Sequence, residues 1–204
     1  MAVINPRYEF RIWGDDLSRI KRALEQLGDS RTPSASDEVY LISRATDDCN
    51  AKIRSDTMDI KLLVGEYRHL EQWQPVLKAD FPLKSATIVG EIFPLLHLDV
   101  PSLMRTEYGV PDFLGEIVHP ERKIAVARVA KERSRFELGA CVGEFTTVQI
   151  EHLKRHTVAV ESSDAEAVLA MVTRLEINRS ANTSYVREIK RILDIPTVSA
   201  ARNG

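Results

Sequence analysis

The segment Val129–Leu138 reads VAKERSRFEL, and its alternation of residue types decides the fold predicted for this chain. In an extended strand, successive side chains point to opposite sides of the sheet. The charged residues at every second position would therefore share one face of this strand. They are Lys131, Arg133, Arg135 and Glu137. Phe136 and Leu138 would lie on the other face, so one side of the strand is mostly basic and the other is apolar.

The same alternation occurs before and after this segment. RYEFRIW at 7–13 and NAKIRSDTMDIKLLV at 50–64 are typical of strands, and alternation returns from 122 to 161. The first stretch places its charged residues on one face, and the second, which with EVYLIS at 38–43 is expected to form two or three strands, contains two pairs that each share a face. These residues are Arg7, Glu9 and Arg11 in the first stretch, and Lys52 with Arg54, then Asp59 with Lys61, in the second.

Helices are predicted between these strands. GDDLSRIKRALEQLG at 14–28 has apolar residues at helical spacing, with an aspartate near its start and Gly28 at its end. SDAEAVLAMVTRLEI at 163–177 and the segment Tyr185–Leu193 show similar patterns. Residues 70–120 have helix-like apolar spacing interrupted by prolines, so we interpret them as mainly helical.

The composition limits the class of partner. The net charge is −2, with 28 Lys and Arg against 30 Asp and Glu, so any cationic region must come from local arrangement. A general nucleic-acid binder would be more basic, and we therefore do not expect nucleic acid as the partner. No apolar stretch is long enough to cross a bilayer, and no signal peptide is recognisable, so we expect a cytoplasmic protein without membrane contact.

The charged faces are the feature that points to function. An antiparallel sheet with one solvated face explains any single strand. The faces together are rich in Arg and Lys, which favours instead a closed barrel with a charged interior and helices over its apolar outside. Like charges so close together repel each other, so a polyanion is needed to neutralise them. Triphosphate with a divalent cation would suit Arg, Lys and carboxylates together.

The order of several short motifs resembles the CYTH superfamily, the triphosphate tunnel metalloenzymes. The resemblance covers about Arg7 to Leu193 and includes YEFR, KIR, MDIKLL, EQWQPVLKADFPL, VAKERSRFEL, TVAVES and SYVREIKRIL. It implies an α+β fold with a closed, eight-stranded antiparallel β-barrel, surrounding helices and a helical insertion. The expected organisation is one domain over 1–204, with the insertion at about 70–120 and a tail at about 195–204. The sequence leaves a homodimer open.

The resemblance also implies roles for individual residues. The family's opening Glu-x-Glu-x-Lys strand falls on Arg7, Glu9 and Arg11, and its last-strand Glu-x-Glu pair falls on Ala159 and Glu161. Mg²⁺ or Mn²⁺ would be held by the remaining acids, which are Glu9, Glu144 and Glu161. Phosphate would be bound by basic residues, which are Arg7, Arg11, Lys52, Arg54, Lys61, Lys131, Arg133, Arg135 and Lys190. Which residues of the 131–135 strand contact phosphate stays open.

Three functions follow from this resemblance. The first is metal-dependent hydrolysis of inorganic, nucleoside or thiamine triphosphate, with Glu9, Glu161, Arg54 and Arg133 as the catalytic residues. The second is a class IV-type adenylate cyclase on the same scaffold. The third is a non-catalytic module that binds triphosphate or polyphosphate, which is motivated by the two acids replaced by Arg7 and Ala159.

Overall fold

The computed structural model describes residues 5–198, and eight long strands form its framework. They are β1 (Arg7–Gly14), β3 (Ser34–Ser43), β4 (Cys49–Arg54), β5 (Thr57–Tyr67), β6 (Leu70–Asp80), β9 (Ile124–Leu138), β10 (Cys141–Ile150) and β11 (Leu153–Ser162). They pair in the order β10-β11-β1-β6-β5-β4-β3-β9, and β9 pairs with β10 again. The sheet therefore closes into an eight-stranded antiparallel barrel, which confirms the predicted α+β fold class. The predicted tail lies outside the described residues from position 199 onward.

Two compact units can be distinguished within the chain. Unit 1 contains the described residues up to Asp37, together with Leu63–Gln74 and Val129–Ser184, and unit 2 contains the rest. Four strands, β3, β5, β6 and β9, run from one unit into the other along the chain. The expectation of a single domain stays a prediction, and the two units are described separately below.

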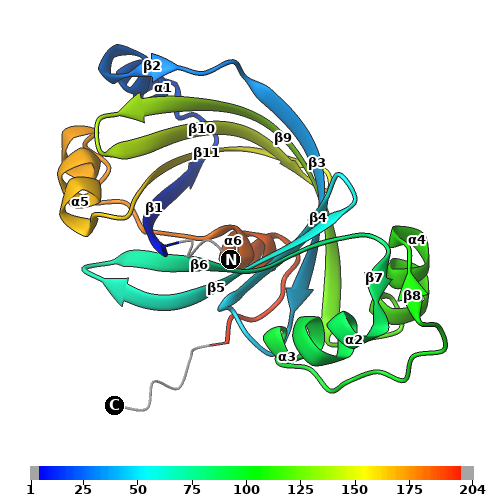
Figure 1. The fold of residues 1–204 in the computed structure, drawn as a ribbon. Coiled ribbons are helices and arrows are strands. Elements are labelled where there is room, and N and C mark those ends of the chain that lie inside the picture. The colour runs from blue at the N-terminus through cyan, green and yellow to red at the C-terminus, as the bar shows by residue number, and fades with distance from the viewer. Residues whose placement is uncertain (1–4, 199–204) are drawn as a thin grey trace. The chain divides into compact units, whose positions relative to one another are not determined.

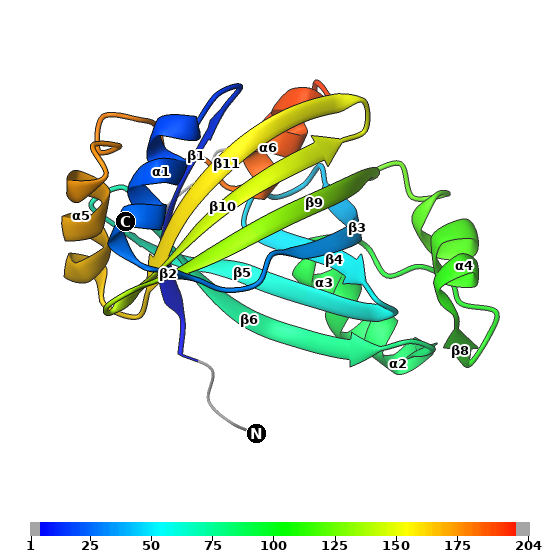
Figure 2. The same ribbon diagram turned by 90° about the horizontal axis from the view of Figure 1, so that it is seen from above.

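In unit 1, two helices cover the apolar side of the strands. They are α1 (Ser18–Leu27) and α5 (Ala165–Arg174), and their buried side chains join those of β1, β9, β10 and β11 in one hydrophobic cluster. Leu24 of α1 and Val168 of α5 are fully buried, and each contributes roughly 1.5–3 kcal/mol through burial. Figure 1 shows both helices outside these strands, and Figure 2 shows them at one end of β10 and β11. The period-two pattern of the sequence thus gives the strands their apolar outer side.

Local signals set the ends of these elements. The Asp16 carboxylate accepts a hydrogen bond from the Ser18 N–H at 2.8 Å where α1 begins, and Asp164 accepts from two backbone N–H groups at the start of α5. α1 ends at Leu27, and it is followed by Gly28, where a Cβ atom would overlap the Glu137 carbonyl oxygen of β9. Gly139 has a φ of 68° in the turn between β9 and β10, a conformation that glycine adopts without strain. A short strand, β2 (Asp29–Ser30), then pairs with β9.

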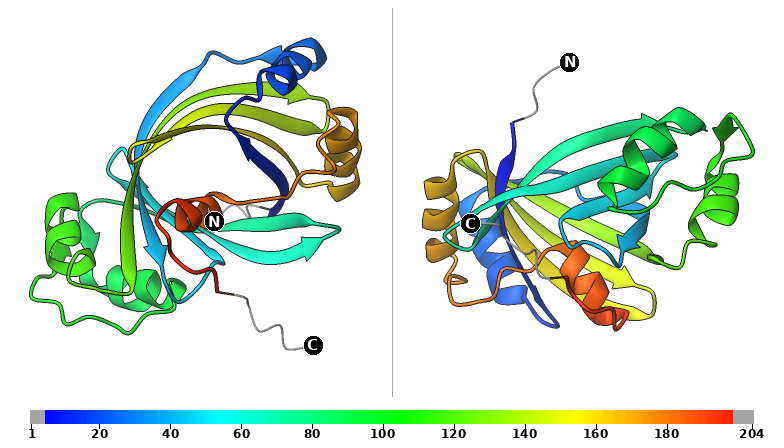
Figure 3. Two further views of the ribbon diagram at one scale, coloured as in Figure 1. Left: turned by 180° about the vertical axis from the view of Figure 1, so that it is seen from behind. Right: turned by 90° about the horizontal axis from the view of Figure 1, so that it is seen from below.

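Unit 2 contains the segment between β6 and β9, which is built from short helical pieces. They are α2 (Ser85–Thr87), η1 (Ile88–Ile92), α3 (Phe93–Leu95), α4 (Val110–Asp112) and η2 (Phe113–Val118), beside the strand pair β7 (Leu83–Lys84) and β8 (Glu107–Tyr108). Figure 3 shows these green segments as one group in both views. Their apolar side chains form a second cluster with those of β4 and β5. No helix within residues 5–198 is both long and apolar enough to span a membrane.

The structure corrects the interpretation of residues 70–120 as mainly helical. Leu70–Asp80 is strand β6, and the first helix begins only at Ser85. Leu70, Trp73 and Leu77 are spaced like one face of a helix, which explains the wrong prediction. Pro75 in the middle of the segment cannot donate a helical hydrogen bond, and pairing with β1 and β5 selects the extended conformation instead.

The last helix, α6 (Tyr185–Ile192), belongs to unit 2 and agrees with the prediction for residues 185–193. Its side chains Tyr185, Val186 and Ile189 are buried. Tyr185 stacks on Tyr40 of β3, with the ring centroids 5.8 Å apart. The helix is therefore held in unit 2 by packing as well as by its polar contacts, which are described below.

Candidate functional site

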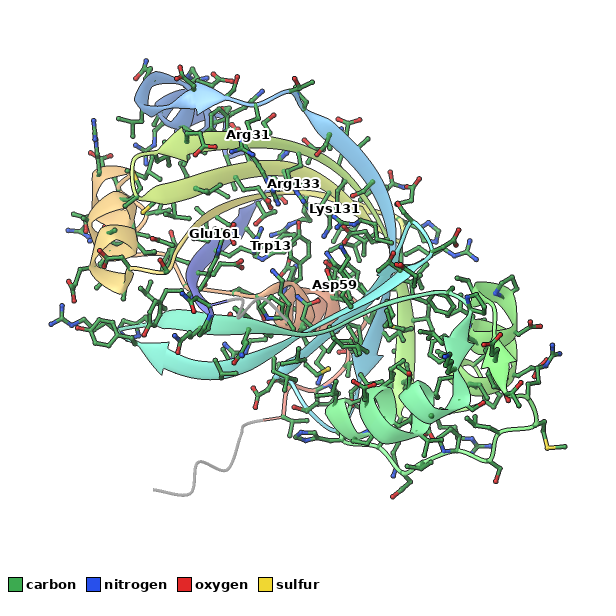
Figure 4. All side chains as sticks on the ribbon, viewed as in Figure 1. Trp13, Arg31, Asp59, Lys131, Arg133 and Glu161 are labelled. Carbon is green, nitrogen blue, oxygen red and sulfur yellow. The ribbon has the colours of Figure 1, made fainter. Side chains whose placement is uncertain are left out.

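Unit 1 has a charged face, which we define as the side of β1, β9, β10 and β11 that points away from α1 and α5. Figure 4 shows the labelled side chains of Trp13, Lys131, Arg133 and Glu161 on this side. The alternation predicted from VAKERSRFEL is confirmed, because Phe136 on the other side of β9 joins the apolar cluster. The charged face therefore presents side chains from four neighbouring strands to one region.

The register of the strands sorts these side chains into rows of different charge. One row is acidic, since Glu9 of β1 is the cross-strand partner of both Glu161 of β11 and Glu71 of β6. Directly paired residues of antiparallel strands point to the same side with their Cβ atoms about 5 Å apart. Three carboxylates thus follow one another across three strands. Sequence reasoning missed Glu71, because the segment that carries it was interpreted as a helix.

The next row places arginines on either side of a glutamate. Arg135 of β9 pairs with Glu144 of β10, which pairs with Ala159 of β11, which in turn pairs with Arg11 of β1. Because Ala159 has a short side chain, the Arg11 guanidinium reaches past it to Glu144, with Nη1 3.5 Å from Oε1. The resemblance would place an acid at position 159, but this chain has alanine there, and the Arg11–Glu144 contact passes over it.

Glu144 is the carboxylate on which the cations of this face converge. Arg133 Nε lies 3.0 Å from Oε2 of Glu144, and Arg135 Nε lies 3.7 Å from the same oxygen. Arg11 contacts the other oxygen, and the Thr146 hydroxyl donates to that oxygen at 3.1 Å. Arg11, Arg133 and Glu144 have side chains only 6%, 11% and 12% exposed, so solvent screens their interaction weakly.

The pKa of Glu144 reports the strength of this positive field. Burial alone would raise the pKa of this carboxyl group, but the attraction of the surrounding cations outweighs burial and lowers it to about 2. The cations are, in decreasing order of effect, Arg11, Arg133, Lys131 and Arg135. Glu144 is therefore fully ionised at neutral pH and serves as the counter-ion of four basic groups.

The other two acids expected to bind metal are also engaged by arginine. Glu9 Oε1 accepts from Arg11 Nε at 2.9 Å, and Glu161 Oε1 accepts from Arg7 Nη1 at 2.9 Å. Arg7 is more than half exposed, so its contact with Glu161 is readily exchanged for solvent or a ligand. The structure thus brings together all three predicted acids and the basic residues of β1 and β9 on one face of unit 1.

The donor set of the acidic row fits a divalent cation in one respect. Within residues 5–198, no three Asp, Glu, His or Cys side chains come close enough to hold a metal ion among themselves. Mg²⁺, however, is commonly held by one or two carboxylates together with water and substrate phosphates. Glu9 and Glu161 are direct cross-strand partners and meet this smaller requirement. The expected Mg²⁺ or Mn²⁺ therefore stays a proposal that rests on these two residues.

Unit 2 contains a cationic group around Glu38 of β3, a residue that sequence reasoning did not single out. The Glu38 carboxylate is completely buried, with Lys52 Nζ 3.2 Å from Oε2 and Arg54 Nη1 3.8 Å from Oε1. Burial lowers the pKa of Lys52, and the negative charges of Glu38 and Asp59 oppose this change. Lys61 lies on β5 opposite Asn50. The shared face predicted for Lys52 and Arg54 is confirmed, since both approach the same carboxylate.

Lys190 of α6 is expected to bind substrate, which stays a prediction, and its side chain pairs with Asp47 in the structure. Its side chain is fully buried in unit 2, where Nζ donates to the Thr46 carbonyl oxygen at 2.9 Å and to the Asp47 carboxylate. Asp47 also accepts from the Val198 N–H at 3.1 Å. These contacts fasten α6 and the segment after it to the loop between β3 and β4. The Lys190 ammonium group is therefore the counter-ion of the buried Asp47 carboxylate.

Comparison with known proteins identifies the fold but no family. No protein-family model matches the chain, and no curated protein matches it. A protein of Pyrococcus horikoshii OT3 aligns with 91% of this chain and 99% of that chain at 14% identity and a TM-score of 0.55. A conserved hypothetical protein from Pyrococcus furiosus aligns with 89% of this chain and 97% of that chain at 15% identity and a TM-score of 0.52. These similarities show a shared fold.

A third similar structure is that of a protein with a described enzymatic activity. It is a candidate adenylyl cyclase from Hippeastrum described as having a dominant triphosphatase activity. It aligns with 97% of this chain and 92% of that chain, at 10% identity and a TM-score of 0.43. A TM-score this low supports no inference about the present chain. The function of the present chain must therefore be argued from its own side chains.

Proposed function

We propose that this chain binds a triphosphate-containing small molecule, or polyphosphate, on the charged face of unit 1. The observation that carries the proposal is the convergence of four cations on the single carboxylate of Glu144. Around Glu144, four cations face the carboxylates of Glu144 and Glu9. Glu71 in the adjacent acidic row adds a third negative charge, and the Arg7–Glu161 pair is neutral, which leaves an excess of one positive charge. In a poorly screened site this excess favours an anion of high charge.

The basic residues are suited to phosphate in particular. Guanidinium groups present paired N–H donors that match phosphate oxygens, and Lys131 adds a compact charge. The arginines come from β1 and β9, on opposite ends of the four-strand face, so a long anion would be contacted from both sides. Arg135 is about half exposed and could exchange its long contact with Glu144 for a ligand oxygen.

Hydrolysis of the bound triphosphate with the help of Mg²⁺ or Mn²⁺ is the finer part of this proposal. Glu9 and Glu161 would hold the cation, which would supply a Lewis acid for the phosphoryl oxygens. Arg11 and Arg133 would hold the phosphates in place and offset the negative charge that develops during transfer. Non-catalytic binding is the second candidate, because each of the three acids already pairs with at least one arginine.

Calorimetric titration with tripolyphosphate tests the binding. Each charge-assisted hydrogen bond is worth about 1.5–3 kcal/mol, so Arg133→Ala should weaken binding roughly tenfold to a hundredfold. Arg19→Ala is the matched control, because Arg19 is exposed and pairs with Glu176 away from the charged face. Equal affinity in both variants and the unmodified chain would contradict the assignment of the site.

Phosphate release from tripolyphosphate, measured with added Mn²⁺ and with EDTA, tests turnover. Loss of release in Glu161→Gln, with release retained in the exposed control Glu176→Gln, is the expected result. Binding without release under any divalent cation would favour the binding module. Mass analysis of the products formed from ATP would distinguish hydrolysis from cyclisation, because cyclic AMP differs in mass from ADP.

A further inference from the structure

Trp13 stands on the charged face rather than in the apolar cluster of unit 1. It is two residues beyond Arg11 on β1, so both side chains point to the same side of the strand. Its cross-strand partner is Thr157 of β11, and Arg11 Nη1 donates to the Thr157 hydroxyl at 3.3 Å. The indole is therefore next to an arginine that faces Glu144, and Figure 4 shows it on the same side as Lys131 and Arg133.

The row that contains Trp13 is otherwise short in side chains. Thr157 pairs with Thr146 of β10, and Thr146 pairs with Arg133 of β9. Two small hydroxyl side chains thus separate the indole from the arginine, over three strand spacings of about 4.8 Å each. This row has an aromatic ring at one end and, at the other, the Arg133 guanidinium that is proposed above to bind phosphate.

The orientation of the indole is fixed by a backbone contact. Its Nε1–H donates to the Thr183 carbonyl oxygen at 2.9 Å, in the segment that leads to α6. Trp13 is half-buried, whereas Trp73, the other tryptophan, is 6% exposed and donates to Glu71. A ring that is anchored at its polar edge and incompletely buried is suited to contact a flat ligand group through its apolar surface.

We propose that Trp13 is a specificity-determining residue that stacks on the ring of a nucleoside triphosphate. The inference rests on the proposed function, since Arg11 and Arg133 would bind the phosphates of the same ligand. It goes further in selecting a ligand class, because inorganic triphosphate has no ring to contact Trp13. Stacking on an aromatic side chain contributes about 1–3 kcal/mol per base, which corresponds to roughly fivefold to a hundredfold in affinity.

The test compares ATP with tripolyphosphate in calorimetric titrations of the full chain. Trp13→Leu should weaken ATP binding roughly fivefold to a hundredfold and leave tripolyphosphate binding within about twofold. Trp13→Phe should retain most of the ATP affinity, because phenylalanine keeps a ring at this position. In the unmodified chain, ATP should quench tryptophan fluorescence and tripolyphosphate should not, and Trp13→Phe should abolish the quenching.

The possible outcomes distinguish the stacking inference from the proposed function on which it rests. If the unmodified chain binds neither ligand, the proposed function fails and the role of Trp13 fails with it. If tripolyphosphate binds and Trp13→Leu weakens both ligands equally, Trp13 is only a structural residue of the face and the stacking inference alone is overturned. The fluorescence measurement uses the unmodified chain, so it tests the inference even if Trp13→Leu fails to fold. Binding of ATP without quenching of tryptophan fluorescence would refute the stacking inference.

Discussion

Replacing Glu144 by glutamine should separate the charge of this residue from its shape. The pKa of Glu144 is lowered from 4.5 to about 2, so the ionised form is favoured in the folded protein by about 2.5 pH units. At 1.36 kcal/mol per unit, ionised Glu144 contributes about 3 kcal/mol to the free energy of unfolding. Glu144→Gln keeps the size of the side chain and removes its charge, and it should lower the free energy of unfolding at pH 7 by about this amount.

The pH dependence gives the sharper measurement. A carboxyl group whose pKa is depressed by folding stabilises the protein above its unfolded pKa, and this stabilisation is lost as the pH falls toward its folded pKa. The stability difference between the unmodified chain and Glu144→Gln should therefore be constant above about pH 5 and should shrink between pH 4.5 and about 2. Urea unfolding followed by circular dichroism at a series of pH values measures this difference.

Glu137→Gln is the matched control for this experiment. Glu137 lies on β9 of the same unit, is 47% exposed and pairs with the exposed Arg31, so its loss should cost at most about 1 kcal/mol. Stability curves for Glu144→Gln that run parallel to those of the unmodified chain down to pH 2 would refute the reasoning. Tripolyphosphate should also bind more tightly to Glu144→Gln, because the competing carboxylate charge is absent.

Three further predictions concern separate parts of the chain. Lys190→Met should lower the free energy of unfolding by about 3–5 kcal/mol, since it removes the ion-pair partner of a buried aspartate. Lys123→Met is the control, because the ion pair of Lys123 with Asp99 is exposed and its loss should change the stability little. Equal losses in urea titrations of both variants would contradict the importance of the buried contact. Gly28→Ala should destabilise the protein, because the added Cβ would overlap a carbonyl oxygen of β9. Gly90→Ala, whose Cβ would meet no atom within 4 Å, should be neutral or stabilising by up to about 1 kcal/mol. A melting temperature of Gly28→Ala at or above that of Gly90→Ala would contradict this prediction. The pKa of Lys52 should lie below 10.5, because burial lowers it, and it should fall further in Glu38→Gln, which removes the carboxylate that Lys52 contacts. NMR titration of labelled lysine measures this pKa, and an unshifted or raised value in Glu38→Gln would contradict the prediction.

Much of the charged face was predictable because strand geometry is strictly local. The side on which Arg11 or Arg133 lies follows from alternation alone, whatever the strand pairs with. The same rule places Trp13 on the charged face, because it lies two positions after Arg11 on β1. Glu71 was missed for a different reason, since the apolar spacing around it also fits a helix, and only pairing with β1 decides between the two conformations.

The sequence does not determine the ion-pair partners of single charged groups. Lys190 is fully buried against Asp47, whereas Lys52 shares the Glu38 carboxylate with Arg54. The sequence shows the charge of such a side chain and not its partner, because the partner is supplied by a different strand or loop. Whether such a charged side chain is available to bind a ligand therefore becomes clear only when its ion-pair partner in the structure is known.

The amino-acid sequence by itself determined that strands with one charged and one apolar face alternate with helices, because a period of two or of 3.6 residues is set within a few positions of the chain. Only the tertiary structure decided which charges meet. Strand register made Glu9 a neighbour of Glu71 and Glu161, and it let Arg11 reach Glu144 across Ala159. Electrostatic interaction depends on distances of a few ångströms between residues far apart in the chain, and register fixes those distances.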